Sequence, residues 1–505
     1  MSPLPGASRS TLATLLLGVA ACTHSPSAAP EARAPDCERL AALAVQGATL
    51  TQATRVPAQG PVPEYCRVRG ELPPSLHFEV RLPTGWNGRT VYNGGGGYDG
   101  VIFPADENLA RGYASVASDG GHTGTPAQGA FALEPGPLED FASLSVHRVL
   151  PVARALIRAH YGQDATKTYF EGCSNGGREG LIAAQRWPED FDGLVIHAPA
   201  HDFVSLMLAF NQHAQRLALP GALPSRAQLS HLGQAMLAAC DAKDGLADGI
   251  VSHPGCAFDP GVLQCQGPER DTCLTPAQVA SARALAAPVV VDGQVLYPGW
   301  PVGDAEDPGG WAAWRLEPGD FERSAGQVLS RELIRYFITR DPGFDPLRFQ
   351  PGAWRERIAE VTAQVSALDP DLSRFRARGG KLILRHGSAD GIISSRGTDA
   401  YYEAVVRAAG GQAQADTFVE YFPAPGVHHC GGIPGPGPNQ VDWLSALETW
   451  VERGVPPSRT PLLAHTPDAT GAPVLSRPVC KYPLYPRYSG AGNPNLADSF
   501  TCVAP

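Results

Sequence analysis

Residues 167–189 have the sequence KTYFEGCSNGGREGLIAAQRWPE, which predicts an apolar strand, a glycine-rich turn and a helix. The turn matches G-x-S-x-G from Gly172 to Gly176, with Ser174 at its centre. In a nucleophile elbow the serine occupies a strained strand-to-helix turn, and flanking glycines avoid clashes with neighbouring backbone. The helix N-terminus favours developing negative charge. The context therefore predicts Ser174 as a nucleophile, although this motif by itself also arises by chance in glycine-rich turns.

Strand and helix patterns alternate on both sides of this elbow. Strand-like runs occur at 76–93, 114–124, 192–200, 380–393 and 418–430, and helical spacing occurs at 146–162, 398–410 and 440–454. This alternation predicts an α/β fold, with a parallel sheet covered by helices on both faces. The rhythm breaks between the two halves, where Gly, Pro and Trp are frequent. The predicted organisation is a core in two parts with an inserted lid domain: 37–200, 201–375 and 376–505.

Partners for the serine follow in the order acid, then histidine, that α/β-hydrolases use. Asp390 follows the strand KLILRHGS, and His429 follows the strand FVEYF. The interval between them has room for one helix and one strand, as that fold requires. The much longer interval from Ser174 to Asp390 holds the inserted region, at the place where this fold carries lids. A turn-forming role in SADG is the alternative for Asp390.

His428 and His429 compete for the role of base, because both lie in one loop. The base must reach the serine with one ring nitrogen and the aspartate with the other. Cys430 follows His429 as Cys173 precedes Ser174. A Cys173–Cys430 disulfide would bring the two Cα atoms to about 4.4–6.8 Å, which suits the neighbours of a Ser–His pair. This pairing favours His429 over His428.

These motifs resemble a known family. The stretches GCSNGGREG, HGSADGII and HHCGGIPGPGP are similar to those of the tannase and feruloyl esterase family, which also contains a terephthalate half-ester hydrolase. The similarity runs from about Cys37 to Cys502. It implies an α/β-hydrolase with a large calcium-bearing lid, a Cys-Ser and His-Cys pair joined by a disulfide, and an Asp that completes the triad.

An acidic loop, CDAKDGLADGIVSHPGC, lies in the predicted lid. Three aspartates stand at short spacing in it: Asp241, Asp244 and Asp248. Carboxylate oxygens so placed suit Ca²⁺, with backbone carbonyls filling the remaining positions, whereas the spacing of an EF-hand is absent. A solvated acidic turn is the alternative. The resemblance implies carbonyl ligands at Leu246 and Ile250 and a structural role for the ion.

The N-terminus predicts export. A short apolar run, 12–22, follows Arg9 and ends in VAAC, which resembles a bacterial lipoprotein cleavage box. This predicts a signal peptide over 1–21, lipidation at Cys22 and a Pro/Ala/Ser-rich tether over 22–36; an ordinary signal peptide is the alternative. A lipid-anchored product would lie at the outer membrane or cell surface, or in the periplasm, and otherwise the protein would be secreted.

The cysteine count agrees with export. The chain has 11 cysteines, and setting Cys22 aside leaves an even number that can pair in an oxidising compartment. Spacing and the family pattern together pair the others as Cys37–Cys66, Cys240–Cys256, Cys265–Cys273 and Cys480–Cys502. A net charge of −10 and a pI of about 5.8 argue against nucleic acid or an anionic membrane surface as the main partner. Membrane attachment is expected through the lipid alone, and the protein is expected to be a monomer.

Other residues complete the predicted site. An oxyanion hole needs two backbone N–H donors: Asn175 after the nucleophile, and Gly95 or Gly96 from the early loop NGGGGYDG. Trp311 and Trp314 share one helical face and form either lid core or a substrate platform. His197 either lines the pocket or is a satisfied buried histidine.

The sequence therefore predicts an exported serine carboxylic-ester hydrolase. The resemblance implies aromatic-acid ester substrates: feruloyl or other hydroxycinnamoyl esters first, galloyl esters second and a terephthalate mono-ester third. Plant polysaccharide or polyphenol conjugates would carry such esters. The alternative from another class is a surface-anchored binding protein on a hydrolase scaffold, which the presence of all three triad residues disfavours. A peptidase is disfavoured by the resemblance alone, because the triad chemistry is shared.

Overall fold

The computed structural model describes residues 37–103, 105–301, 310–312, 323–433 and 435–505. The predicted signal peptide, the tether, Cys22 and Trp314 lie outside these residues. The described core and insertion belong to one compact unit. Within them, no helix is both long and apolar enough to cross a membrane.

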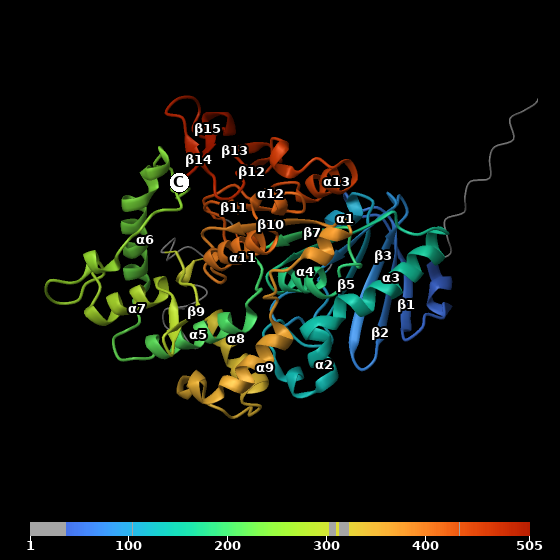
Figure 1. Cartoon of the computed structure of the whole chain (residues 1–505), viewed down its shortest axis with the longest axis horizontal. Coiled ribbons are helices and arrows are strands. Elements are labelled where there is room, and N and C mark those ends of the chain that lie inside the picture. The colour runs from blue at the N-terminus through green and yellow to red at the C-terminus, as the bar shows by residue number, and fades with distance from the viewer. Residues whose placement is uncertain (1–36, 104, 302–309, 313–322, 434) are drawn as a thin grey trace, which may run out of the picture. The chain divides into compact units, whose positions relative to one another are not determined.

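A nine-stranded sheet forms the centre of the described chain (Figure 1). Its strands, in spatial order, are β1 (Thr49–Val56), β2 (Tyr65–Leu72), β3 (Leu76–Pro83), β5 (Ala114–Ser118), β4 (Arg89–Asn93), β6 (Lys167–Cys173), β7 (Gly193–His197), β10 (Lys381–Gly387) and β11 (Val419–Ala424). Pairing is parallel from β5 to β11 and antiparallel from β1 through β3 to β5.

The predicted parallel sheet is confirmed from β5 to β11, and the N-terminal edge, which the sequence did not predict, is antiparallel. Short links join β1 to β2 and β2 to β3, and a short link permits antiparallel pairing, whereas a parallel crossover needs a dozen or more residues. β1 is largely exposed along its length, as an antiparallel edge strand can be. The sequence pattern missed β1 and β2 because neither is a continuous apolar run.

Helices cover both faces of the parallel part. The α-helices are α1 (Asp106–Ala110), α2 (Pro135–Glu139), α3 (Ser145–Tyr161), α4 (Asn175–Arg186), α5 (Phe203–Leu217), α6 (Arg226–Cys240), α7 (Pro276–Ala286), α8 (Ala325–Glu332), α9 (Arg355–Val365), α10 (Ser373–Ala377), α11 (Ser395–Ala408), α12 (Gln412–Ala415) and α13 (Trp443–Arg453). Apolar residues of α3, α4 and α11 pack on one face, and those of α13 pack on the other.

Strand residues alternate between these two cores, as the period of a strand requires. On β6, Phe170 packs with α3 and α4, whereas Tyr169 packs with α13. On β7, Leu194 and Val195 divide in the same way. Burial on both faces explains why the central strands are nearly continuous apolar runs in the sequence.

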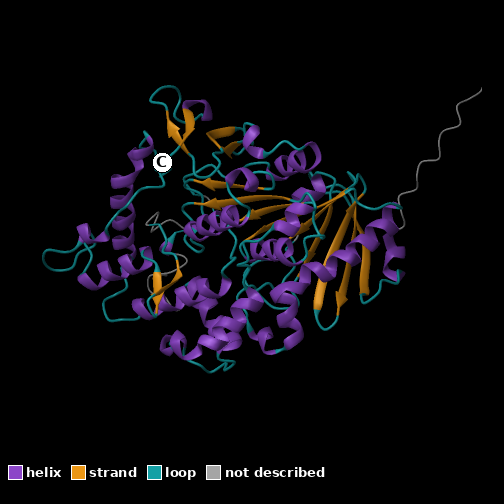
Figure 2. Ribbon diagram, viewed as in Figure 1, coloured by secondary structure: helices purple, strands orange, loops and turns teal. Residues whose placement is uncertain are grey.

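The insertion lies between β7 and β10 and adds no strand to the nine-stranded sheet, as far as the described residues show. It is mainly helical, from α5 to α10, with the small β8–β9 hairpin (Val289–Val291 and Gln294–Tyr297), and appears in green to amber in Figure 1. Figure 2 shows the same separation of helix-rich and sheet-rich regions. Trp311 is 3% exposed within the apolar core of this insertion, which supports its interpretation as lid core.

The chain ends in two small antiparallel hairpins. They are β12–β13 (Leu463–Pro467 and Pro473–Pro478) and β14–β15 (Tyr485–Tyr488 and Phe500–Val503). The described residues contain five disulfides, with the pairing expected from the sequence: Cys37–Cys66, Cys173–Cys430, Cys240–Cys256, Cys265–Cys273 and Cys480–Cys502.

Candidate active site

The elbow between β6 and α4 holds Ser174 in a strained conformation. Ser174 has φ 60° and ψ −121°, in the left-handed half of the Ramachandran plot that a residue with a side chain rarely adopts. Glycine is required on both sides. A Cβ on Gly172 would lie 2.6 Å from the carbonyl oxygen of Gly176, and one on Gly176 would lie 2.7 Å from that of Gly95. The turn therefore presents the serine at the carboxyl end of β6, above the N-terminus of α4.

Asp390 lies in the loop after β10 and is 3% exposed. Its Oδ1 accepts the backbone N–H groups of Ile392 and Ile393, each at 2.9 Å. Burial alone would raise the pKa of Asp390, but the facing histidines His429 and His386 and their hydrogen bonds hold it well below its usual range. The carboxyl group therefore stays ionised, ready to orient an imidazole.

The two adjacent histidines have different partners. Nδ1 of His429 lies 2.7 Å from Oδ2 of Asp390, whereas Nδ1 of His428 lies 3.0 Å from the carbonyl oxygen of Ala389. Since the carboxylate accepts, His429 carries its proton on Nδ1, and Nε2 is the nitrogen left to act as a base. This geometry agrees with the choice of His429 over His428.

A disulfide joins the elbow to the histidine loop. Cys173 and Cys430 have Cα atoms 5.8 Å apart. One ring nitrogen of His429 lies within 4.8 Å of both sulfur atoms. This group is not a metal site, because both sulfurs are bonded to each other and neither is a thiolate. The bridge brings together the residues that flank Ser174 and His429, although they are far apart in the chain.

A second histidine contacts the aspartate, and the sequence did not assign it a role. His386 is 1% exposed, and its Nε2 lies 3.1 Å from both Oδ2 of Asp390 and the carbonyl oxygen of Ile393. Its Nδ1 lies 2.8 Å from the hydroxyl oxygen of Thr398. Since Nε2 faces two acceptors, it donates, and His386 contacts the same carboxylate oxygen, Oδ2, that faces His429. The one available signal was its position four residues before Asp390 in HGSADG.

The glycine loop after β4 carries both candidates for the second oxyanion donor, and the structure argues against one of them, Gly95. The backbone N–H of Gly95 donates to Oε2 of Glu179 at 3.0 Å, so it is not available to a substrate oxyanion. The structure therefore argues against Gly95 and leaves Gly96 as the candidate partner of Asn175. The sequence NGGGG could not distinguish Gly95 from Gly96, because the difference between them arises from the side chain of Glu179 on α4.

His197 ends β7 beside the elbow. Its Nε2 lies 3.1 Å from a carboxylate oxygen of Glu171, and its side chain is 13% exposed. Arg385 occupies the paired position on β10, and burial lowers its pKa to about 10. The Nε2 atom of His197 is thus partnered, whereas its Nδ1 is buried without a hydrogen-bond partner among the described residues, so the interpretation as a satisfied histidine holds for one ring nitrogen only.

The acidic loop fits a cation in part. Asp244 is 2% exposed, and burial raises its pKa, while one oxygen of Asp241 is buried without a hydrogen-bond partner among the described residues. A bound cation would stabilise both groups. Asp248, however, hydrogen-bonds Arg477 at 2.5 Å. In the described part of the chain, the three aspartates do not form a cluster with all ligand atoms within 4.8 Å. Asp241 and Asp244 therefore suit an oxygen-liganded cation, whereas Asp248 is occupied by Arg477.

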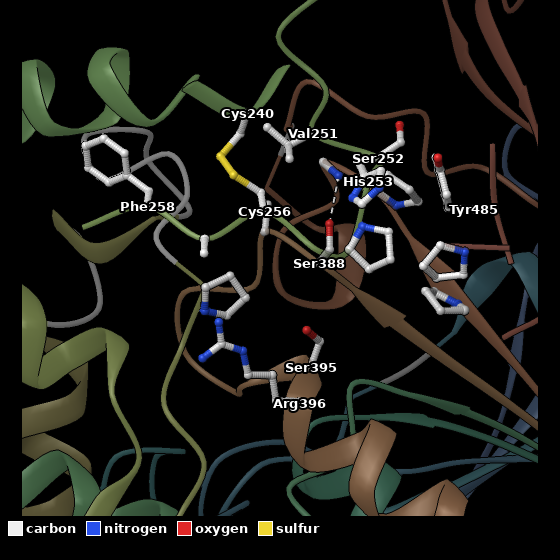
Figure 3. A pocket seen from close by; sticks show the side chains of 18 of the residues that line it. Cys240, Val251, Ser252, His253, Cys256, Phe258, Ser388, Ser395, Arg396 and Tyr485 are labelled. Carbon is white, nitrogen blue, oxygen red and sulfur yellow. Dashed lines mark hydrogen bonds between the residues drawn. A yellow bond between two sulfur atoms is a disulfide. The ribbon is translucent and has the colours of Figure 1, made fainter. Parts of the chain in front are cut away.

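A cavity of about 1050 Å³ lies next to this loop. Figure 3 shows the Cys240–Cys256 disulfide, Ser252 and Ser388 around it, with Tyr485 from the C-terminal hairpin at one side. At Ser388 the cavity reaches the loop that carries Asp390. Neither Ser174 nor His429 is among the described residues that line it. It therefore adjoins the acid of the candidate triad, through His386 and Ala389, without reaching the candidate nucleophile.

The sheet order, the strained serine elbow and the acid and histidine loops at successive strand ends define an α/β-hydrolase. The family model for tannase and feruloyl esterase matches residues 59–503, and the chain belongs to this family. It is a carboxylic ester hydrolase.

Curated relatives match over most of their length. A mono(2-hydroxyethyl) terephthalate hydrolase from Piscinibacter sakaiensis is 34% identical, over 88% of this chain and 85% of the relative. Feruloyl esterase B from Aspergillus niger is 32% identical, over 87% of each chain. Among solved structures, feruloyl esterase B from Aspergillus oryzae has a TM-score of 0.83 at 26% identity, covering 92% of this chain and 99% of that one.

Proposed function

We propose that the protein hydrolyses esters through an acyl-enzyme on Ser174. His429 takes the proton of the serine hydroxyl as this oxygen attacks the ester carbonyl carbon, and then gives that proton to the leaving alcohol. Asp390 orients His429 and stabilises the imidazolium. The observation that carries this proposal is the Asp390–His429 hydrogen bond, in a loop that the Cys173–Cys430 disulfide joins to the elbow.

The second half of the reaction uses the same groups. Water attacks the acyl-enzyme, His429 removes its proton, and Ser174 regains a proton as the acid leaves. The backbone N–H groups of Asn175 and Gly96 are proposed to bind the oxyanion in both tetrahedral intermediates, since charge develops there in each step.

Esters of aromatic acids are the proposed substrates, with feruloyl and other hydroxycinnamoyl esters first. This rests on the names of the relatives, several of which are feruloyl esterases. Galloyl esters and terephthalate mono-esters are the alternatives, the latter because of the Piscinibacter sakaiensis relative. The insertion between β7 and β10 is proposed to act as the lid that selects among these acids, because it is the large segment outside the sheet.

A substrate panel tests this order. Purified protein is assayed with methyl ferulate, methyl gallate, mono(2-hydroxyethyl) terephthalate and p-nitrophenyl acetate, and we expect the largest kcat/KM for methyl ferulate. A preference for gallate or the terephthalate ester would replace the first substrate class by that alternative. Turnover of none of the four, in protein with a cooperative melting transition, would instead favour the binding-protein hypothesis.

Calcium is proposed as a structural ion in the acidic loop, held by Asp241, Asp244 and the carbonyls of Leu246 and Ile250, while Asp248 pairs with Arg477. A ligand present at about 100 times its Kd stabilises the folded state by about 2.7 kcal/mol. We therefore expect EDTA to lower the melting temperature by several degrees, and Ca²⁺, but not Mg²⁺, to restore it.

The variant that tests this site is Asp241→Asn, which removes the negative charge of the carboxyl group with the buried, unpartnered oxygen. We expect its melting temperature to be lower than that of the parent and no longer responsive to EDTA. Metal analysis of the purified parent supplies the independent readout. An unchanged melting curve together with less than stoichiometric calcium would contradict the proposal.

Export to an oxidising compartment is proposed from the disulfides. All ten described cysteines are paired, and such pairing is typical of secreted and periplasmic proteins. Lipidation at Cys22, with the product anchored at the outer membrane, is proposed from the sequence of the cleavage box. Intact mass measurement of the mature chain distinguishes an acylated Cys22 from an ordinary cleaved terminus.

A further inference from the structure

Two buried carboxyl groups contact the two loops of the proposed oxyanion hole. Asp99 belongs to the glycine loop after β4 and is fully buried, and Glu179 belongs to α4 and is 5% exposed. The proposed mechanism uses neither side chain. Both approach Gly95: its N–H donates to Glu179, and a Cβ placed on it would touch the carboxyl group of Asp99. Two ionised carboxylates cannot hydrogen-bond each other.

The proposed oxyanion hole has two halves, the elbow with Asn175 and the glycine loop with Gly96, and each carboxyl group belongs to one half and contacts the other. Oδ1 of Asp99, on the glycine loop, accepts from the side-chain amide of Asn175, on the elbow, at 2.5 Å. Oε2 of Glu179, which follows the elbow on α4, accepts the backbone N–H of Gly95, on the glycine loop, at 3.0 Å. Each half is thus held by a carboxyl group from the other.

These bonds leave one oxygen on each carboxyl group. Oδ2 of Asp99 and Oε1 of Glu179 are both buried, and no donor contacts either of them among the described residues. Two bare carboxylates on either side of Gly95 would place like charges in a medium of low dielectric constant. One proton between them satisfies all four oxygens: Asp99 donates from Oδ2 to Oε1 of Glu179, and the other two oxygens accept from Asn175 and Gly95.

Asp99 has no room to turn away from this contact. A Cβ placed on Gly95 would lie 2.6 Å from Oδ2 of Asp99, and one placed on Gly120 would lie 2.4 Å from the same atom. The two glycines therefore fit tightly around the carboxyl group. The backbone encloses Asp99 on both sides and directs it at α4.

The charged neighbours of Asp99 shift its pKa in opposite directions. Burial, followed by the charge of Glu179, raises the pKa of Asp99 well above its usual range, whereas Arg178 on α4 lowers it. Arg178 is fully buried and donates to Oδ1 of Asn175 at 2.6 Å and to three backbone carbonyls, so its charge is shared. Tyr92 on β4 and Asp119 after β5 also lie near the pair, and neither supplies a positive charge.

We propose that Asp99 is a protonated carboxylic acid in the working enzyme, and that its hydrogen bond to Glu179 joins the two halves of the oxyanion hole. This rests on the proposed function. Asp99 and Glu179 are positioning residues, since they touch the N–H-bearing loops and not the substrate. Loss of the proton would leave two carboxylates in contact and separate the donors, so kcat falls at alkaline pH while KM changes less.

The same proton gives stability a definite pH dependence. The unfolded chain releases it near pH 3.9, whereas the folded chain keeps it to a higher pH. Between these two pKa values the folded state binds more protons, so this group makes the free energy of unfolding fall as pH rises. The fall ends once pH exceeds the pKa of Asp99 in the folded state.

Amide variants test the proton directly. In Glu179→Gln the side-chain oxygen accepts from Gly95 and the NH₂ group donates to Asp99, and in Asp99→Asn the NH₂ group donates to Glu179. We expect both to keep most of the parental kcat at neutral pH and to lose its alkaline fall. Asp99→Ala and Glu179→Ala leave N–H groups unheld and are expected to lower kcat by about 10²-fold. Asp190→Asn, at another buried carboxyl group with a raised pKa, is the matched control and keeps the parental pH profile.

Infrared difference spectroscopy supplies a readout independent of activity. Parent minus Asp99→Asn should show the C=O stretch of a protonated carboxylic acid at neutral pH, and the stability of the parent should fall more steeply with pH. If the parent hydrolyses no ester, the proposed function fails, while the infrared band still decides the state of Asp99. Absence of the band, or an equal loss of kcat in folded Asp99→Asn and Asp99→Ala, would overturn the inference.

Discussion

Ser174→Ala is expected to lower kcat for ester hydrolysis by about 10⁶-fold. Alanine keeps the elbow geometry, including the positive φ, but removes the oxygen that forms the acyl-enzyme. The oxyanion donors and the histidine remain, so water-mediated hydrolysis at a low residual rate is the expected remainder. Steady-state and burst kinetics with p-nitrophenyl acetate measure both the loss of turnover and the loss of the acyl-enzyme burst.

The control for this variant is Ser489→Ala, at an exposed serine in the C-terminal region. Expressed and purified in the same way, it should match the parent in rate, and all three proteins should melt at nearly the same temperature. A Ser174→Ala protein that keeps a tenth or more of the parental kcat, or that still shows a burst, would refute the assignment of the nucleophile.

The second large effect concerns the bridge between the catalytic loops. We expect the double variant Cys173→Ala/Cys430→Ala to lose about 3–5 kcal/mol of stability, because the disulfide closes a long loop of chain. Its kcat should also fall by about 10²-fold, since the His429 loop is no longer held against the elbow and small misplacements of a catalytic group are costly. Thermal unfolding and kcat measured below the melting temperature separate the two losses.

The matched control removes a bridge that does not touch the site. Cys480→Ala/Cys502→Ala opens a disulfide between the link that joins the two C-terminal hairpins and strand β15, with a sequence separation of 22 against 257. It should lower stability by about 3 kcal/mol and leave kcat near the parental value. If both double variants lost the same fraction of kcat, the Cys173–Cys430 bridge would be a general stabiliser and would not position His429.

The triad candidates were accessible from the sequence because each carries a local signal. Ser174 lies in a glycine-rich turn between a strand and a helix, and Asp390 and His429 each follow an apolar strand. Strand ends in a parallel sheet lie at one edge, so chain order was enough to place these residues near one another. The cysteines beside Ser174 and His429 then distinguished His429 from His428.

Other features had no local signal. β1 was missed because an edge strand with exposed residues lacks the continuous apolar run of a buried strand, and β2 was missed because charged residues interrupt its sequence YCRVRGEL. Gly95 and Gly96 are equivalent in the sequence, and it is the side chain of Glu179 that occupies the N–H of Gly95. His386 resembled any buried strand residue until its ring was found on Asp390.

The sequence by itself determined the chemistry and the order of the site: the strained serine turn, the acid and base that follow it, and an even set of cysteines. These features depend on short-range periodicity and on chain order, and both are properties of the sequence that need no tertiary structure. The tertiary structure decided that the N–H of Gly95 is occupied by Glu179, that a second histidine contacts Asp390, and that Asp99 and Glu179 are buried against the loops beside Ser174. Those properties depend on burial and on contacts between distant segments, because the dielectric environment and the hydrogen-bond partners of a group exist only once the chain has folded.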